Sequence, residues 1–277
     1  MNRVDNIIIG FGKAGKTLAG YLGSKGEKTV LVEKSPLMYG GTCINVGCIP
    51  SKFLTTSADR KAYSQLEDEE YYKQAVENKK ALISKLNKAN YDKVAGVPNV
   101  EVIDGLASFK DEHTVSIKTE SGVQELYAER IFINTGTTPF VPETEGLEIK
   151  GRIHTSETIM NLEEFPRSLA ISGSGFIGLE FAASYAKFGT KVTIIDRGSK
   201  ILPREDDDVA NAVFEAYKGL GIEFIFDANI EKVEQDESEV KISYSSKGEA
   251  HELIAEAFLV ATGRKANVEG LNLEAAG

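Results

Sequence analysis

One pattern occurs twice in this chain and limits its fold more than any other feature. A short apolar strand runs into Gly-x-Gly-x-x-Gly, a helical stretch follows, and the next apolar strand ends at an acidic residue. The motifs begin at Gly10 and Gly173, and Glu33 and Asp196 each follow 23 residues later. This order is typical of a βαβ unit in which a glycine turn joins strand to helix. The sequence therefore predicts an α/β fold with two similar dinucleotide-binding modules.

Length and charge restrict the class of protein. The 277 residues suffice for about two domains. With 42 acidic and 32 basic side chains, the formal net charge is −10, which opposes binding to nucleic acid or to an anionic membrane surface. The chain has no run of about 18 apolar residues that could span a membrane, and its first residues lack the layout of a signal peptide. We therefore expect a cytoplasmic protein without nucleic acid or membrane partners.

The regions after the two βαβ units also correspond. Residues 100–133 and 222–260 alternate apolar and polar side chains between turn residues, which predicts antiparallel strands. Each region ends in an apolar strand that runs into Thr-Gly, at Thr135-Gly136 and Thr262-Gly263. The first copy is longer, and the excess at about 40–95 holds both cysteines and a polar stretch, Asp68 to Asp92, that predicts an amphipathic helix. Residues 137–168, with three prolines, are predicted to connect the copies.

The glycines have distinct predicted roles. The first makes the tight turn, the second lets a pyrophosphate approach the backbone, and the third allows the helix to pack on the strand. The helix N-terminus offers free N–H groups to the phosphates, and Glu33 and Asp196 would accept hydrogen bonds from ribose hydroxyls. In the alternative interpretation the glycines serve the turn geometry alone. A carboxylate at Asp196 repels a 2′-phosphate and favours NADH, although Arg197 beside it leaves NADPH open.

Cys43 and Cys48 are the only cysteines. In a regular helix this spacing corresponds to about 7.5 Å of rise, whereas a disulfide joins Cα atoms about 4.4–6.8 Å apart. A bridge would therefore need a distorted turn, which Gly47 could provide. Pro50 suits the first turn of a helix and would place Cys48 at a helix N-terminus, where a thiolate is favoured. Zinc lacks the usual ligand spacing, and two inert buried thiols are the remaining alternative.

Together these motifs resemble a known family. The first glycine turn with Glu33, the run Gly-Gly-Thr-Cys-x4-Cys-x-Pro-Ser-Lys at 40–52, and the second turn with Glu180 are similar to class I pyridine nucleotide–disulfide oxidoreductases. Residues 10–19, 38–43 and 202–206 are most similar to the branch of reactive-chlorine-resistance oxidoreductases, which is related to dihydrolipoamide dehydrogenase and mercuric reductase. Lys13 departs from the residue usual in the lipoamide and glutathione enzymes, which argues against those two substrates.

The resemblance implies FAD at the first turn and NADH, or NADPH, at the second. It implies that Cys48 faces the flavin, that Cys43 attacks the substrate, and that Phe176 covers the flavin until nicotinamide enters. It also implies that Lys52 and Glu180 form an ion pair beside the flavin. The other implied FAD contacts are Gly10, Gly12, Lys13, Ala14, Gly15, Glu33, Gly41, Thr42, Ala107, Thr135 and Gly136. The other implied NAD contacts are Gly173, Gly175, Ile177, Gly178, Asp196, Arg197, Val233, Gly263 and Arg264.

The family's architecture implies two Rossmann-like, three-layer ββα modules, with the NAD module inserted in the FAD module. We expect an FAD-binding domain at 1–148, an NAD(P)-binding domain at 149–266, and the start of a return segment at 267–277. The implied reaction passes electrons from NAD(P)H through FAD to the cysteine pair. From there they reach a disulfide, a metal ion or a product of oxidant stress.

Family members continue with the rest of the FAD domain and a dimerisation domain that supplies a catalytic His–Glu pair. Since none of the three histidines matches that context, we expect a fragment that binds FAD weakly or not at all and does not turn over disulfides normally. We expect the full-length protein to be a homodimer. The alternatives are a non-catalytic nucleotide-binding or redox-sensing module and a flavin NADH oxidase.

Overall fold

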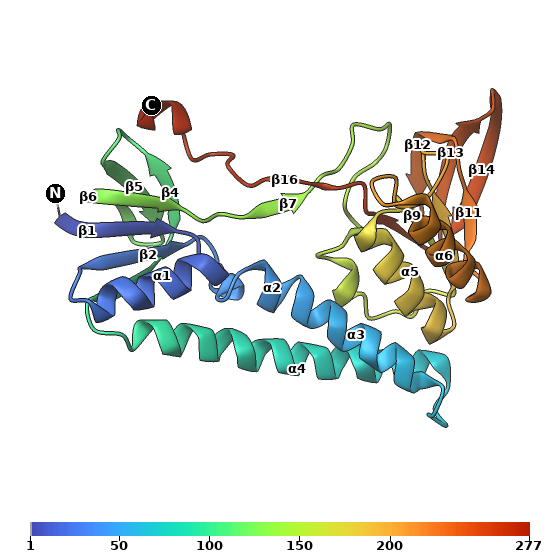
Figure 1. Ribbon diagram of the computed structural model, residues 1–277, viewed down its shortest axis with the longest axis horizontal. Helices are drawn as coiled ribbons and strands as arrows, with labels where there is room; N and C mark the ends of the chain where they lie inside the picture. Colours follow the sequence, from blue (N-terminus) through green and yellow to red (C-terminus); the bar gives the residue numbers. More distant parts are fainter. Residues whose placement is uncertain (1) are drawn as a thin grey trace. The chain divides into compact units, whose positions relative to one another are not determined.

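A computed structural model describes residues 2–277 of the chain (Figure 1). The chain divides into two compact units, each assembled from separate stretches of sequence. Unit 1 comprises the described residues through Pro50, Ala81–Thr138 and Ala266–Gly277. Unit 2 comprises Ser51–Lys80 and Pro139–Lys265. Two helices, α3 (Cys48–Lys61) and α4 (Asp68–Ala95), contribute residues to both units.

Unit 1 contains a six-stranded sheet in the order β3-β2-β1-β6-β5-β4. Strands β1, β2, β3 and β6 run parallel, whereas β4, β5 and β6 form an antiparallel meander. These strands are β1 (Asn2–Ile9), β2 (Thr29–Glu33), β3 (Val100–Asp104), β4 (Leu106–Phe109), β5 (Thr114–Thr119) and β6 (Gly122–Ile133). The helical elements of this unit, besides its part of α3 and α4, are α1 (Lys13–Ser24), η1 (Pro36–Met38), α2 (Thr42–Asn45) and η3 (Leu273–Ala276).

The parallel strands of unit 1 are apolar on both faces because both faces are covered. Ile8 and Leu31 pack with Ala19 and Leu22 of α1 on one face. On the other face Ile7 and its neighbours pack with the antiparallel strands and with Leu271 of the C-terminal stretch. The glycine turn after β1 therefore lies at the carboxyl edge of a fully covered sheet.

Unit 2 contains a five-stranded parallel sheet in the order β11-β10-β9-β15-β8 and a three-stranded antiparallel sheet, β12-β13-β14. The parallel strands are β8 (Ile153–Thr155), β9 (Ser168–Ser172), β10 (Lys191–Ile195), β11 (Glu223–Ile225) and β15 (Ala257–Val260). The antiparallel strands are β12 (Ala228–Gln235), β13 (Val240–Ser246) and β14 (Glu249–Ala255). The remaining elements of unit 2 are η2 (Ile159–Asn161), α5 (Phe176–Phe188) and α6 (Asp207–Gly219). The paired strands β7 (Thr137–Pro139) and β16 (Arg264–Ala266) each have residues in both units.

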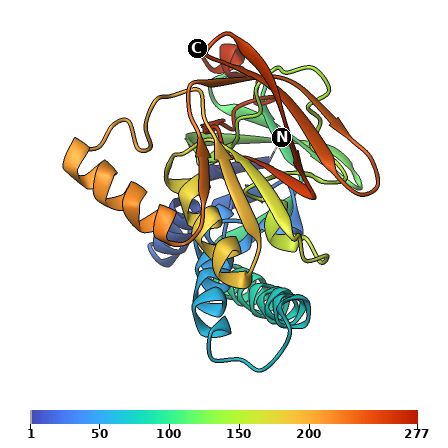
Figure 2. The ribbon, with the colours of Figure 1, turned by 90° about the vertical axis from the view of Figure 1, so that its right-hand side faces the viewer.

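The parallel sheet of unit 2 also has two covered faces (Figure 2). Ala170 and Phe258 pack against Val233 and Ile242 of the antiparallel sheet. Along β9, side chains alternate between the faces, so Ile171 points the other way, towards Gly178 at the start of α5. The helix ends at Gly189, whose φ of +108° is a left-handed conformation that favours glycine.

Most predicted elements are present, including both βαβ units and the long helix that begins with Asp68. The prediction of purely antiparallel strands in 100–133 and 222–260 was wrong at the ends of these regions. Strand β3 pairs parallel with β2, β11 pairs parallel with β10, and β15 pairs parallel with β9. These strands are half or fully buried, and alternation alone does not determine which partner a strand takes. The predicted connection at 137–168 also contains β8, an edge strand of the parallel sheet.

Candidate functional site

The first glycine turn is shaped by close backbone approaches. A Cβ on Gly10 would lie 2.3 Å from the Asn134 carbonyl oxygen, and one on Gly15 would lie 2.4 Å from the Gly10 oxygen. Gly12 caps α1 with extended backbone and no side-chain hydrogen bond, so the cap leaves the first N–H groups of α1 without a side-chain acceptor. Lys13 and Ala14 form the first turn of α1. Only glycine fits the two close approaches without a shift of the backbone.

Glu33 lies at the end of β2 and is buried. Its carboxylate accepts hydrogen bonds from Phe11 N at 2.9 Å and from Ser35 N at 3.2 Å. Burial raises the pKa of Glu33, and these backbone donors lower it. The carboxylate therefore holds the glycine turn in place, a structural role that the sequence analysis did not predict.

The second glycine turn repeats this arrangement. A Cβ on Gly173 would lie 2.6 Å from the Ala261 oxygen, and one on Gly178 would lie 2.0 Å from the Gly173 oxygen. Asp196 accepts hydrogen bonds from Ser174 N at 2.6 Å and from Gly198 N at 2.7 Å. At Gly175, by contrast, a Cβ would meet nothing within 4 Å.

The cysteines lie in consecutive short elements of unit 1. Cys43 belongs to α2, and Cys48 is the first residue of α3, as the position of Pro50 predicts. Both are thiols in the structure, with Cys43 half-buried and Cys48 exposed. Gly47 has no positive φ; a Cβ there would lie 2.9 Å from the Thr42 oxygen. Glycine is therefore required at 47 because the Thr42 carbonyl group lies too close for a side chain. It is not required for the distorted turn that the sequence suggested.

The segment before Cys43 packs on the first glycine turn. Gly41 has a φ of +74°, and a Cβ there would lie 2.6 Å from the Cα atom of Gly12. Asn45 donates hydrogen bonds to the carbonyl oxygens of Tyr39 and Gly41, at 3.0 and 2.9 Å, which fixes the loop around Gly41. The cysteine segment and the candidate nucleotide turn are thus one assembly within unit 1.

Burial raises the pKa of the Cys43 thiol, and the hydrogen bond and charge of Cys48 raise it further. The ammonium of Lys16 and a backbone hydrogen bond from Cys48 lower it. The two sulfur side chains are therefore close enough to influence each other directly, and the surroundings of Cys43 on balance favour its neutral form.

Within unit 2, α3 and α5 are joined along their length. Lys52 Nζ lies 2.6 Å from Glu180 Oε1, in an ion pair whose side chains are 65% and 30% exposed. One turn further along, Thr55 Oγ1 and Ser184 Oγ are 2.9 Å apart. The structure thus brings the predicted pair Lys52 and Glu180 together.

Other predicted residues have different surroundings. Phe176, the first residue of α5, is 69% exposed, and Ile177 follows it in the same turn. Arg197 is exposed, and Arg264 pairs with Glu157 at 2.8 Å. Gly263 accepts a hydrogen bond from Phe140 N at 2.9 Å.

Ala107 and Val233 are both buried among core side chains of their own units. Val233 also donates its backbone N–H to the Glu145 oxygen at 2.9 Å, and its carbonyl oxygen would lie 2.1 Å from a Cβ on Gly146. The backbone N–H of Val233 is therefore engaged within the protein, and Gly146 packs against its carbonyl group. Ala107, whose side chain is buried, could offer a ligand only its backbone.

Asn134 and the pair Thr55 and Ser184 were not predicted from the sequence. Asn134 Nδ2 donates to the Gly10 oxygen at 3.0 Å and so supports the first turn. Its position directly before Thr135-Gly136, which follow the last parallel strand, was the available signal. Thr55 and Ser184 lie three and four residues after Lys52 and Glu180, the spacing of one helical turn.

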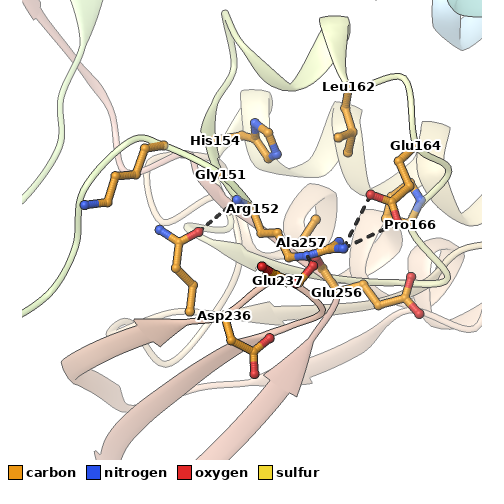
Figure 3. Close-up of a pocket in the computed structure, with 12 residues that line it drawn as sticks. Gly151, Arg152, His154, Leu162, Glu164, Pro166, Asp236, Glu237, Glu256 and Ala257 are labelled. Atoms are coloured by element: carbon orange, nitrogen blue, oxygen red, sulfur yellow. Dashed lines mark hydrogen bonds and ion pairs between the residues drawn. The ribbon is translucent and has the colours of Figure 1, made fainter.

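A cavity of about 680 Å³ lies elsewhere in unit 2 (Figure 3). Arg152, Pro166 and Glu256, which stand just before β8, β9 and β15, line it. Arg152 donates hydrogen bonds to the carbonyl oxygens of Glu237 at 2.8 Å and Glu256 at 3.0 Å. Parallel sheets bind nucleotides at the carboxyl ends of their strands, so this cavity, at the amino ends, is not the candidate nucleotide site.

Within residues 2–277, no three His, Cys, Asp or Glu side chains are grouped so that they could hold a metal ion. No helix in the same range is long and apolar enough to cross a membrane.

Comparison with known proteins decides the family. A family model described as "Pyridine nucleotide-disulphide oxidoreductase" matches residues 4–277. The chain belongs to this family. The family predicted from the glycine and cysteine motifs is therefore confirmed.

Relatives agree with this assignment. The chain is 38% identical over 277 residues to the probable pyridine nucleotide-disulfide oxidoreductase RclA of Escherichia coli (strain K12), covering 100% of this chain and 60% of the relative. It is 32% identical over 284 residues to the dihydrolipoyl dehydrogenase of Geobacillus stearothermophilus, covering 99% and 59%. It is 33% identical over 283 residues to the mercuric reductase of Lysinibacillus sphaericus, covering 99% and 50%.

A solved structure confirms the α/β fold. It is described as the Cu(II) complex of the HOCl-induced flavoprotein disulfide reductase RclA from Escherichia coli. It matches with a TM-score of 0.92 at 38% identity, over 100% of this chain and 60% of that one. The chain thus spans about 60% of the length of its RclA and dihydrolipoyl dehydrogenase relatives.

Proposed function

We propose that this chain carries the two nucleotide sites and the redox pair of a flavin-dependent oxidoreductase. In this proposal electrons pass from NAD(P)H through FAD to Cys43 and Cys48, and from there to an acceptor. The observation that carries it is the packing of Gly41 on Gly12, because it joins the cysteine segment to a nucleotide-binding turn. A cysteine pair of merely structural use would not need that connection.

Unit 1 fits FAD. Gly12 caps α1 without a side-chain hydrogen bond, which leaves the first N–H groups of α1 to a ligand and suits a pyrophosphate at a helix N-terminus. Thr42, Thr135, Gly136 and the backbone of Ala107 complete the proposed contacts. We assign 1–148 to the FAD domain, of which residues 51–80 and 139–148 belong to unit 2, and 267–277 to its return segment. The assignment is supported by the hydrogen bond from Phe109 N to the Leu271 oxygen, 2.8 Å long, within unit 1.

Unit 2 fits the nicotinamide nucleotide, and we assign residues 149–266 to this Rossmann-like domain. Gly175 has open space around it, so a pyrophosphate could approach the backbone there. Asp196 is held by backbone donors on both oxygens, and its fixed charge would repel a 2′-phosphate. These features favour NADH over NADPH, with Arg197, Gly263 and Arg264 as further contacts.

FAD, when bound, supplies the chemistry that links hydride donation by the nicotinamide to reduction of a disulfide. The protein's residues position the reactants. In the proposal, Lys52 and Glu180 hold each other beside the flavin ring, and the exposed Phe176 shields that site until the nicotinamide arrives. Cys48 is the thiol on the flavin side, and Cys43 exchanges with the acceptor.

The acceptor in this proposal is a disulfide, a metal ion or a product of oxidant stress. Relatives in the same family are described as a mercuric reductase and as an HOCl-induced disulfide reductase in complex with Cu(II). A close pair of thiols can reduce a disulfide by exchange or bind a soft metal ion, so both classes suit Cys43 and Cys48.

The test uses the full-length gene product loaded with FAD. We expect NADH to drive reduction of a small aromatic disulfide, and Cys43→Ser and Cys48→Ser each to abolish that reduction while NADH binding is kept. Steady-state rates and NADH fluorescence report the two properties. Unchanged NADH oxidation in Cys43→Ser would instead support an NADH oxidase. Gel filtration tests the proposed homodimer.

A further inference from the structure

Lys16 is a cation that the proposed function does not use. It lies in the first turn of α1, where its N–H donates to the Gly12 oxygen at 3.0 Å. Its side-chain ammonium donates a hydrogen bond to Asn90 Oδ1 on α4. Asn90 is itself oriented by a hydrogen bond to the Leu86 oxygen, 2.7 Å long. The ammonium is therefore held at a defined place and does not move freely in solvent.

That place is beside the cysteine segment. A Cβ on Gly40 would lie 3.2 Å from the side-chain amide carbon of Asn90, the same amide that holds Lys16. On the other side, Gly41 packs on Gly12, four residues before Lys16. Figure 1 shows α2 next to the start of α1. All of these residues belong to unit 1.

We propose that Lys16 is a positioning residue that stabilises Cys43 as the attacking thiolate. This proposal rests on the proposed function, because Lys16 supplies the positive charge that the thiol exchange in the proposed function needs. The groups with a charge influence on Cys43 are Cys48, which disfavours the thiolate, and Lys16, which favours it. Lys16 in turn is influenced by burial, Lys13 and Lys93, which lower its pKa, and by Cys43, which raises it.

The step itself is a thiol–disulfide exchange. The Cys43 thiolate attacks one sulfur of an acceptor disulfide, so a mixed disulfide forms and the other acceptor sulfur leaves as a thiolate that takes a proton. The Cys48 thiolate then attacks Cys43, the Cys43–Cys48 disulfide forms, and the second acceptor thiol is released. Exchange is carried by the thiolate and not by the thiol, so a cation beside Cys43 raises the rate of the first attack.

The test measures Cys43 directly and needs neither FAD nor NADH. In a Cys48→Ser background, the rate of alkylation by iodoacetamide is followed between about pH 6 and about pH 10, where a cysteine thiol titrates. We expect Lys16→Met to lower the rate near neutral pH by about five-fold and to shift the profile to higher pH, because the thiolate loses its cation. Lys93→Met is the matched control, since it removes a cation that influences Lys16 but not Cys43. We expect it to change the rate by less than about 1.5-fold.

Two further variants separate charge from structure. Lys16→Arg should keep at least about half of the parent rate, because the charge is retained. Asn90→Ala should lower the rate by less than Lys16→Met, because it frees the ammonium without removing it. The proposal is overturned if the Lys16→Met profile coincides with the parent profile, or if Lys16→Arg falls as far as Lys16→Met. Since the readout is thiol reactivity, this result is independent of whether the protein reduces disulfides with NADH.

Discussion

The two glycine turns are built alike and surrounded differently. In each, the first glycine touches the carbonyl of the residue before Thr-Gly, and the third touches the carbonyl of the first. In each, a carboxylate at the end of the second strand accepts a hydrogen bond from the residue after the first glycine. The repeated motif therefore encodes a complete local structure, with the acid as part of the turn.

The surroundings differ at the middle glycine. Gly12 is packed against Gly41 of the cysteine segment, whereas Gly175 has open space and the exposed Phe176 beside it. One turn is thus built into the redox segment and the other is left accessible. This difference suits a resident cofactor at the first turn and a nucleotide that exchanges during each cycle at the second.

Substitution of the glycines should give the largest contrast. Gly41→Ala places a methyl group against the Gly12 backbone at a positive φ, and we expect it to lower the free energy of unfolding by about 2–4 kcal/mol. Gly175→Ala meets open space, and we expect a change below about 0.5 kcal/mol. Urea denaturation followed by circular dichroism measures both. Equal losses in the two variants would remove the distinction between a built-in and an open turn.

The charge at the second turn should set the choice of nucleotide. Asp196→Asn keeps an oxygen for the turn but removes the charge, so we expect NADH to bind about ten-fold more weakly and the preference over NADPH to narrow. Fluorescence titration with both nucleotides checks this, with Asp208→Asn on the exposed start of α6 as the control. A preference that stays unchanged in Asp196→Asn would show that the carboxylate serves the turn alone.

Glu33 should make the stability of the first turn depend on pH. Burial raises the pKa of Glu33 above its value in the unfolded chain, so the folded state binds the Glu33 proton more tightly. The stability that this proton contributes is fully present below the unfolded pKa and is lost as pH rises through the folded pKa. We therefore expect Glu33→Gln to lose less stability than the parent between about pH 4 and about pH 7. Unfolding curves across that range test it against Glu101→Gln, an exposed carboxylate on β3. If the free energy of unfolding changed with pH in the same way in the parent and in Glu33→Gln, Glu33 would not be the source of the pH dependence.

The smallest effect on stability is expected at the ion pair. Lys52 and Glu180 are partly exposed, and pairs of this kind contribute at most about 1 kcal/mol. Lys52→Met should therefore change the midpoint of urea unfolding little, while NADH-driven disulfide reduction by the full-length protein falls if the pair orients the flavin. Thr55→Val, one turn along the same helix, is the matched control. A large loss of stability without loss of turnover would make the pair structural.

Much of this molecule could be predicted from its sequence because the informative residues are local. Gly10 and Glu33 lie within one βαβ unit, and Gly173 and Asp196 lie within the other. Within such a unit, the spacing of the residues along the sequence determines which of them are in contact. Pro50 marked the start of α3 for the same reason. The parallel pairing of β3 and the contact of Gly41 with Gly12 could not be derived in this way, because they depend on which distant segments meet.

The electrostatic roles were hardest to predict. Glu33 and Asp196 were expected to accept hydrogen bonds from ribose hydroxyls, and in the structure both accept hydrogen bonds from the backbone of their own turns. For the buried Glu33 the reason is that a buried carboxylate needs donors in the folded chain itself. Lys16 shows the same limit. Its distance in sequence from Cys43 gave no sign that Asn90 would hold it beside the cysteine segment.

In the proposed function, electrons from NADH reach the cysteine pair. The most direct measurement adds one equivalent of NADH, without oxygen, to the full-length protein with FAD bound and the pair oxidised. Iodoacetamide then traps any thiols for mass spectrometry. We predict that Cys43 and Cys48 both become labelled as NADH is consumed. NADH consumption with both cysteines unlabelled would contradict it.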